Sequence, residues 1–285
     1  MNKEEALRFG HSRIGEYVIY IYRKIFARKC FIFVNRTLFH LSLRGLGVLN
    51  FSIKNTSKVS GELYFIKNIL PKFITPIKPI IFDIGANEGD YTKDIINNFP
   101  RVDIFAFEPH PKTFSRLKIN TASDNVNLYN LAMGDTQSKM TLYDIEGDGS
   151  VGATLHSKVL TELYKKDITS YEVNVETLDN FVAKAKINEI DLLKIDVEGN
   201  ELAILKGASK LLKSNKIKCI HFEFNEMNVI SRTFSRDIRN TLVDYNLYRL
   251  LPNGLINLDD LFTIEKELFG YQNIIALPKS FSVKF

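Results

Sequence analysis

An acid-rich glycine loop occupies residues 82–91, with the sequence FDIGANEGDY. Loops of this kind between a strand and a helix lie where open α/β sheets bind ligands. A dinucleotide fingerprint that begins at Gly85 needs glycines at positions 87 and 90, but Asn87 and Asp90 stand there. Glu88 and Asp90 would repel a pyrophosphate and attract a cation such as a sulfonium. The loop therefore favours a cation-bearing ligand, with the alternative that its acids only complement a helix dipole.

Another acid, Glu108, ends the sequence FAFE and lies 23 residues after Gly85. In nucleotide-binding α/β folds, an acidic side chain about 20 residues after the glycine turn accepts hydrogen bonds from a ribose diol. Glu108 is therefore our candidate for binding a ribose. The alternative is a solvated acid at the end of a strand.

The elements that must position these residues alternate between strand and helix patterns. Residues 80–84 form an apolar run broken only by Asp83, which is typical of a parallel strand buried on both faces. Asp90 is expected to cap the next helix, and Pro111 to open another. We expect strands at 80–84, 103–107, 126–131, 191–195 and 217–224, and helices at 91–99, from 111 and at 201–213. This alternation predicts an α/β fold with a doubly wound, mostly parallel sheet.

Two regions depart from this alternation. The insertion between 136 and 181 holds a period-two strand pattern at 171–178 and a glycine-rich loop at 147–152, and we expect it to hang over one end of the sheet. Near the C-terminus, the patterns at 245–251 and 271–277, with an Asn-Gly turn signal between them, predict antiparallel strands at a sheet edge.

Several motifs together resemble those of FkbM-type methyltransferases. They are DIGANEGDY, FEPHP, LAMGD at 131–135, ETLDNF at 176–181 and LLKIDVEGNELAILKGA at 192–208. The resemblance covers about 61–279, and KIDVEGNE is its most specific part. It implies a Rossmann-like class I methyltransferase fold, S-adenosylmethionine as cofactor, and O-methylation of a hydroxyl on a sugar, in a surface polysaccharide or glycan precursor, or on a secondary metabolite.

The resemblance also implies a cofactor site. It places Asp83, Gly85, Asn87 and Gly89 around the methionine moiety, Glu108 on the ribose, and Ala132, Met133, Gly134 and Asp135 near the adenine. Ala86, Glu88 and Pro109 belong to the same motifs and complete the expected set. His110 is expected to cap a helix or to meet the adenine edge, rather than to take part in catalysis.

Methylation of an alcohol needs a group that accepts the hydroxyl proton. Asp196 and Glu198 follow a strand at the sheet edge that also carries the cofactor loop, and they are the leading candidates. The alternative is that they cap the helix that begins near Glu201. Glu223 on the next strand and His156 in the insertion are further catalytic candidates.

A metal-assisted site is a second possibility for the same edge. Asp196 with Glu223 and Asn225 would suit a hard divalent cation, but we favour a site without a metal. Ser150, Thr154 and His156 belong to the loop expected over the acceptor pocket, where they would contact a polyhydroxylated acceptor. His221 lies within a strand pattern and is expected to pack.

Charge separates the N-terminal part of the chain from the rest. Residues 1–60 hold eleven Lys and Arg against three acids, and this surplus of +8 leaves −3 of the net +5 for the remainder. An acidic body argues against a nucleic-acid groove. We therefore expect a basic, aromatic helical segment at 1–60 and a methyltransferase domain at 61–285. The interleaved basic and apolar residues at 17–44 suit an interfacial helix on an anionic membrane, or an arm packed on the domain.

The remaining sequence features bear on location and on competing functions. Two distant cysteines, no secretory signal and no apolar run of about 20 residues favour a cytoplasmic protein, peripheral at the inner face of the membrane if the N-terminal segment binds lipid. The alternative function is a non-catalytic nucleotide-binding or scaffolding protein on the same fold. A nicotinamide-dependent oxidoreductase is disfavoured by Asn87 and Asp90.

Overall fold

The computed structural model describes residues 12–52, 56–75, 77–145, 153–156, 158, 161 and 168–280. The α-helices are α2 (Arg13–Phe26), α3 (Ile32–Gly45), α4 (Thr56–Val59), α5 (Glu62–Tyr64), α6 (Asp90–Asn98), α7 (Pro111–Asn120), α8 (Leu178–Ala185), α9 (Glu201–Gly207), α10 (Ser209–Lys213), α11 (Met227–Ser231), α12 (Ser235–Thr241) and α13 (Thr263–Lys266). Short 3-10 or π turns occupy η1 (Lys29–Phe31), η2 (Phe65–Ile69), η3 (Leu70–Lys72) and η5 (Leu258–Asp260). The strands are β1 (Ile80–Ile84), β2 (Asp103–Phe107), β3 (Val126–Tyr129), β4 (Ala132–Met133), β5 (Ser138–Ile145), β6 (Ile168–Glu176), β7 (Leu192–Ile195), β8 (Ile220–Phe224), β9 (Tyr245–Leu251), β10 (Gly254–Asn257) and β11 (Gln272–Pro278).

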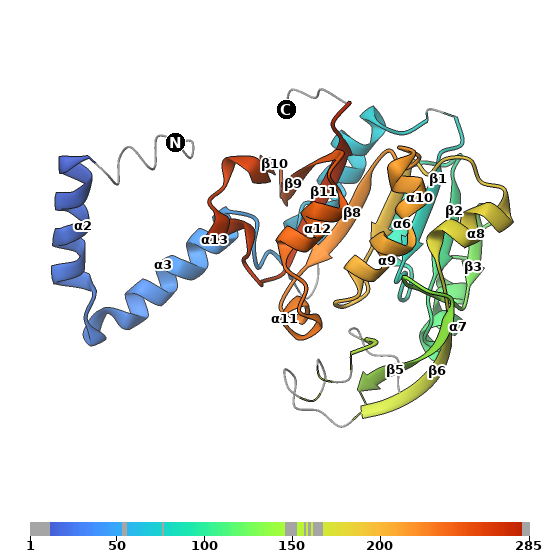
Figure 1. Ribbon diagram of the computed structural model, residues 1–285, viewed down its shortest axis with the longest axis horizontal. Coiled ribbons are helices and arrows are strands. Elements are labelled where there is room, and N and C mark those ends of the chain that lie inside the picture. Colours follow the sequence, from blue (N-terminus) through green and yellow to red (C-terminus); the bar gives the residue numbers. More distant parts are fainter. Residues whose placement is uncertain are drawn as a thin grey trace.

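A mixed eight-stranded sheet forms the centre of the molecule, in the order β10-β9-β11-β8-β7-β1-β2-β3 (Figure 1). Strands β3, β2, β1, β7 and β8 run parallel, and β11 pairs antiparallel with both β8 and β9. The expected doubly wound sheet with antiparallel C-terminal edge strands is confirmed. The chain order changes direction between β1 and β7, and such a switch point is where ligands bind in open α/β sheets.

Helices cover both faces of this sheet because its central strands are apolar on both sides. In β1, Phe82 belongs to one buried cluster, to which α8, α9, α10 and α12 contribute. Its neighbour Ile81 belongs to a second buried cluster, to which η2, α6 and α7 contribute. Successive strand residues point to opposite faces, so a continuous apolar run feeds both cores.

The insertion forms a second, three-stranded sheet in the order β4-β6-β5. Strands β5 and β6 make a long antiparallel hairpin at the lower end of the view in Figure 1, and β4 pairs parallel with β6. The strand pattern expected at 171–178 overlaps β6, which begins earlier, at Ile168, and ends at Glu176 because Thr177 caps α8. The hairpin projects beyond the end of the main sheet, as anticipated.

Two expectations about the helices were wrong. Asp90 does not cap α6, because Gly89 occupies the N-cap position with a left-handed φ of +90°. The helix expected at 201–213 is broken at Ala208 into α9 and α10. A contact from another helix accompanies this break. The Asp179 carboxylate of α8 accepts hydrogen bonds from the backbone N–H groups of Lys210 and Leu211 in α10, at 2.8 and 3.0 Å. A carboxylate there satisfies donors at the start of α10.

The strand expected at 217–224 is shorter than its pattern and begins at Ile220, with a separate bridge between Ile217 and Ile190. Strand β3 ends at Tyr129, before the expected end at residue 131.

The N-terminal helices α2 and α3 extend away from the sheet as an arm (Figure 1). Only the end of this arm is anchored, through the buried side chains of Leu43 and Val48. The buried guanidinium of Arg249 on β9 also donates a hydrogen bond to the Leu46 carbonyl, at 3.3 Å. No helix among the described residues is long and apolar enough to cross a membrane. The division of the chain at residue 60 stays a prediction.

Candidate active site

A pocket of about 760 Å³, open to solvent, lies at the carboxyl ends of β1, β2 and β7. The insertion closes one side of it. Its lining residues come from six separate segments: Ile84, Gly85, Asn87; Glu108, Pro109, Thr113; Leu131, Ala132, Met133; Leu142; Ala153, Thr154, Leu155; and Asp196, Val197, Glu198, Asn200. The structure thus brings the expected cofactor loop and the expected acid pair to one pocket.

Gly85 lets the cofactor loop approach the end of β7. Its φ is +82°, and a Cβ atom there would collide with the Asp196 carbonyl. The Gly85 and Ala86 N–H groups both donate to the Phe107 carbonyl, which joins the loop to β2. At Asn87, which lines the pocket, the side-chain Oδ1 is buried and has no partner among the described residues. An unpaired buried acceptor is costly, so this atom suits a ligand donor.

Glu108 lies against the same loop. Its Oε2 accepts a hydrogen bond from the Asn87 N–H at 3.0 Å, and its Oε1 accepts one from the His110 N–H at 2.8 Å. Burial raises the pKa of Glu108 to about 7, although these two hydrogen bonds oppose the shift. Each carboxylate oxygen keeps a second acceptor position, which a ribose hydroxyl fits. His110 caps α7, because its Nδ1 accepts from the Thr113 N–H.

The other expected cofactor residues divide between the pocket and its surroundings. Pro109, Ala132 and Met133 line the pocket. The remaining six do not, and they are Asp83, Ala86, Glu88, Gly89, Gly134 and Asp135. Two of these acids have other partners. Buried Asp83 accepts a hydrogen bond from the Thr92 hydroxyl at 2.6 Å, and burial raises its pKa to about 6. Glu88 pairs with Arg116 at 2.8 Å on the outside of the loop.

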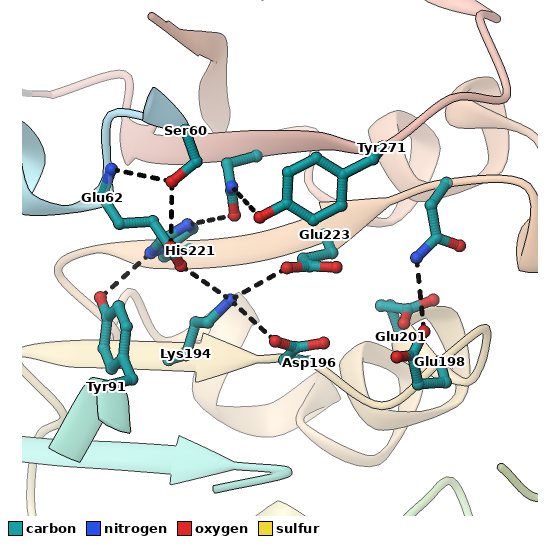
Figure 2. Close-up of polar contacts among 12 residues, drawn as sticks. Ser60, Glu62, Tyr91, Lys194, Asp196, Glu198, Glu201, His221, Glu223 and Tyr271 are labelled. Atoms are coloured by element: carbon teal, nitrogen blue, oxygen red, sulfur yellow. Dashed lines mark hydrogen bonds and ion pairs between the residues drawn. The ribbon is translucent and has the colours of Figure 1, made fainter. Parts of the chain in front are cut away.

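A buried lysine stands at the centre of the polar cluster beside the pocket (Figure 2). The Lys194 side chain is only 2% exposed, and its ammonium lies 3.5 Å from Asp196, 3.7 Å from Glu62 and 3.9 Å from Glu223. Burial lowers the pKa of Lys194, but these three carboxylates outweigh it and the net shift is upward. Lys194 is therefore charged, and its single ammonium group forms ion pairs with three carboxylates.

Sequence reasoning missed both Lys194 and Glu62. The available signal for Lys194 was a single charged residue inside the buried run LLKI. A lysine is almost never fully buried unless it is paired, so its position alone pointed to carboxylates nearby. Glu62 gave no comparable signal, because it comes from the short helix α5 far away in the sequence.

Asp196 and Glu198 differ in their surroundings although both line the pocket. Asp196 has the Lys194 ammonium beside it. Among the described residues, the Asn225 amide is the only side chain that donates a hydrogen bond to the Glu198 carboxylate, at 3.5 Å. Burial raises the pKa of Glu198 to about 8, and repulsion from Asp196 and Glu201 adds to the shift. Neither residue caps α9, whose N-cap is Asn200.

Glu223 lies behind Asp196 and faces Lys194 rather than the pocket (Figure 2). Burial and repulsion from Asp196 raise its pKa well above the usual range. The Lys194 ammonium thus occupies the space near Asp196 and Glu223 where the alternative hypothesis put a metal ion. Among the described residues, no group of three or more His, Cys, Asp or Glu is arranged to hold a metal.

The remaining candidates are the histidines and the loop that was expected to cover the acceptor pocket. His156 is not among the lining residues, and burial lowers its pKa despite a hydrogen bond with the Gly199 backbone. Thr154 lines the pocket, and its hydroxyl donates a hydrogen bond to the Glu198 carbonyl at 2.9 Å. Ser150 and the glycine-rich loop at 147–152 lie outside the described residues. The expectation that His221 packs is confirmed, since it is buried between Tyr91 and Asn273, at 3.0 and 2.7 Å.

Comparison with known protein families identifies the family of the chain that carries this pocket. The sequence model of the methyltransferase FkbM domain matches residues 83–250, which include the cofactor loop, Glu108, Asp196 and Glu198. The chain belongs to the FkbM methyltransferase family. It is an S-adenosylmethionine-dependent methyltransferase, as the resemblance implied.

Two named methyltransferases and one solved structure are similar to this chain over part of their length. The 2-O-methyltransferase NoeI of Sinorhizobium fredii is 26% identical over 188 residues, which are 62% of this chain and 76% of NoeI. The hexuronic acid methyltransferase AglP of Haloferax volcanii is 30% identical over 136 residues, which are 47% of this chain and only 52% of AglP. A solved FkbM methyltransferase from Methylobacillus flagellatus is similar at 11% identity and a TM-score of 0.44, covering 83% of this chain and 58% of that one.

The residues of the pocket fit S-adenosylmethionine. The unpaired Oδ1 of Asn87 offers an acceptor, and Glu108 offers a carboxylate with free acceptor positions. No Lys or Arg is among the described residues that line the pocket, whereas Glu108, Asp196 and Glu198 are. An acidic pocket of this kind suits a ligand that carries a sulfonium charge.

Proposed function

We propose that this methyltransferase transfers a methyl group from S-adenosylmethionine to a hydroxyl group of a sugar, in a surface polysaccharide or glycan precursor, or of a secondary metabolite. One observation carries the proposal: Glu108 and Asn87 line the same pocket as Asp196 and Glu198. A cofactor site and a candidate base therefore meet in one place. The printed names of NoeI, which is a 2-O-methyltransferase, and AglP, which acts on a hexuronic acid, support an acceptor of this class.

We assign the cofactor end of the pocket to Gly85, Asn87, Glu108 and Met133. Glu108 accepts hydrogen bonds from the ribose hydroxyls, and Asn87 Oδ1 accepts one from a ligand donor. Ala132 and Met133 provide an apolar wall for the adenine. When bound, S-adenosylmethionine supplies an electrophilic methyl group.

We assign the other end to the acceptor, with Asp196 as general base. Its side chain is 32% exposed, so an acceptor can reach it, and the Lys194 ammonium lies 3.5 Å from its carboxylate. As the hydroxyl oxygen takes the methyl group, Asp196 accepts the hydroxyl proton. Thr154 and Asn200 also line the pocket and offer hydrogen bonds to a polyhydroxylated acceptor. Glu223 and His156 remain reserve candidates for the base.

The test of the reaction is transfer of radiolabelled methyl groups from S-adenosylmethionine to an extract of the cell that makes the protein. The proposal predicts label in a carbohydrate or small-metabolite fraction. A non-catalytic nucleotide-binding or scaffolding protein would bind the cofactor and transfer nothing, and that result would contradict the proposal.

We further propose that α2 and α3 bring the protein to an anionic membrane on the cytoplasmic side. Along α2, Ile14, Tyr17, Val18, Ile21 and Ile25 recur at spacings of three and four residues, and every one of them is exposed. This spacing places them on one face of the helix. Of the basic side chains on α2, Arg23 lies opposite this face, and Arg13 and Lys24 flank one side of it. An exposed apolar face flanked by cations suits insertion among anionic headgroups.

A further inference from the structure

Glu198 lines the pocket, and no cation among the described residues pairs with its carboxyl group. The acids that face it come from three elements: Asp196 at the end of β7, Glu201 in α9 and Glu226 at the start of α11. Of these, Asp196 has Lys194 as a partner at 3.5 Å. Glu201 accepts hydrogen bonds from the Gly199 N–H and the Asn228 amide, both at 3.0 Å.

The backbone holds Glu198 in this position. Its φ is +55°, in the left-handed region that a residue other than glycine rarely adopts, and Gly199 follows with a φ of +102°. The Thr154 hydroxyl bonds to the Glu198 carbonyl at 2.9 Å, and His156 is hydrogen-bonded to the Gly199 backbone. An unusual conformation that its surroundings secure is a common feature of functional sites. The Glu198 side chain therefore stays at the pocket wall.

We propose that Glu198 is a charge-sensing carboxyl group, which releases its proton to solvent when S-adenosylmethionine binds and does so far less when S-adenosylhomocysteine binds. The inference rests on the proposed pocket. The two ligands share the adenine, the ribose, the ammonium and the carboxylate, and they differ in the methyl group and in the positive charge on sulfur. A cation in the pocket favours the carboxylate form of an acid that no other cation stabilises.

The protonation state of the ligand-free enzyme makes this release measurable. Because burial and neighbouring acids raise the pKa of Glu198 to about 8, the group is mostly protonated at neutral pH. The cofactor's charge would convert it from a hydrogen-bond donor into an acceptor beside Asp196 (Figure 2). After transfer the sulfur is neutral, so Glu198 binds a proton again, and the hydroxyl proton that Asp196 accepted supplies it. Both carboxyls then return to their ligand-free state, and the one proton that the reaction produces is the one released to solvent on binding.

Calorimetry measures the release without any acceptor substrate. Titration of the full-length protein at about pH 7 in two buffers of different ionisation enthalpy gives the number of protons released per ligand bound. We expect S-adenosylmethionine to release more protons than S-adenosylhomocysteine, with a difference that approaches about one. Any contribution from Glu108 cancels, because both ligands carry the ribose.

Two variants assign the proton to its group. Glu198→Gln should bind both ligands and lose the difference between them. Glu226→Gln, which removes a neighbouring acid that does not line the pocket, should keep it. Equal proton counts for the two ligands in the wild-type protein would overturn the proposal, and so would a difference that survives in Glu198→Gln. Failure of S-adenosylmethionine to bind at all would instead contradict the proposed cofactor pocket.

The wild-type protein alone offers a second test, which does not depend on a variant that folds. Because binding favours the ionised form, the affinity for S-adenosylmethionine should rise with pH below about 8 and level off above it. Relative to S-adenosylhomocysteine, the gain should approach about tenfold per pH unit over the lower part of this range. An affinity ratio that is constant from about pH 6 to 9 would overturn the proposal.

Discussion

Replacing Glu108 by alanine removes the acceptor that we assign to the ribose hydroxyls. A hydrogen bond to a charged group contributes about 1.5–3 kcal/mol, so the dissociation constant of S-adenosylmethionine should rise about 10- to 150-fold. At neutral pH the rise in the dissociation constant should fall toward the lower end of this range, because burial raises the pKa of Glu108 to about 7 and its carboxyl group is partly protonated. The variant also leaves the N–H groups of Asn87 and His110 without their acceptor, which water in the enlarged pocket can replace.

Titration calorimetry measures this loss, and thermal unfolding checks that the variant is folded. Glu88→Ala is the matched control, because Glu88 belongs to the same motif but pairs with Arg116 outside the pocket. Its effect on affinity should stay within about threefold, as for a surface ion pair. Unchanged affinity in a folded Glu108→Ala protein would refute the ribose assignment. A large loss in Glu88→Ala would refute the account of which loop residues face the ligand.

Three other changes probe the rest of the site and the N-terminal arm. Asp196→Asn should lower kcat by about 10²–10⁴ and leave cofactor affinity nearly unchanged, and a native rate would move the base elsewhere. Lys194→Met removes the cation beside Asp196 and the buried carboxyls of Glu62 and Glu223, so the acidic limb of the pH–rate profile should move to higher pH; an unmoved limb would exclude this role. Full-length protein should sediment with phosphatidylglycerol vesicles at low salt, and Ile21→Asp should weaken this; equal sedimentation of both would contradict the membrane proposal.

The sequence predicted the architecture well because the strands of the parallel sheet carry their own signal. Residues 80–84 are apolar and bounded by a turn, and such runs are recognisable without knowledge of the neighbours. The break at Ala208 depends instead on Asp179, which reaches α10 from another helix. A sequence pattern in residues 201–213 contains no trace of that contact.

The candidate site was predictable where sequence neighbours are also neighbours in space. Gly85, Glu108 and Asp196 each follow the last residue of a parallel strand of the main sheet, and the carboxyl ends of such strands meet at one edge. The ion pairs of Lys194 with Glu62, Asp196 and Glu223 were not predictable in this way, because these residues come from segments that only the folded chain brings together. The different surroundings of Asp196 and Glu198 follow from this arrangement, and so does the choice between them as base.

The chemical nature of the methylated product tests the central claim most directly. Full-length protein is incubated with S-adenosylmethionine labelled on its methyl group and with an extract of the cell that makes the protein, and the labelled product is then treated with mild alkali. A methyl ether on a hydroxyl group survives this treatment, whereas a methyl ester on a carboxyl group is hydrolysed and releases its label as methanol. The account predicts an alkali-stable label whose formation falls sharply in Asp196→Asn. An alkali-labile label, or cofactor binding without any transfer, would contradict it.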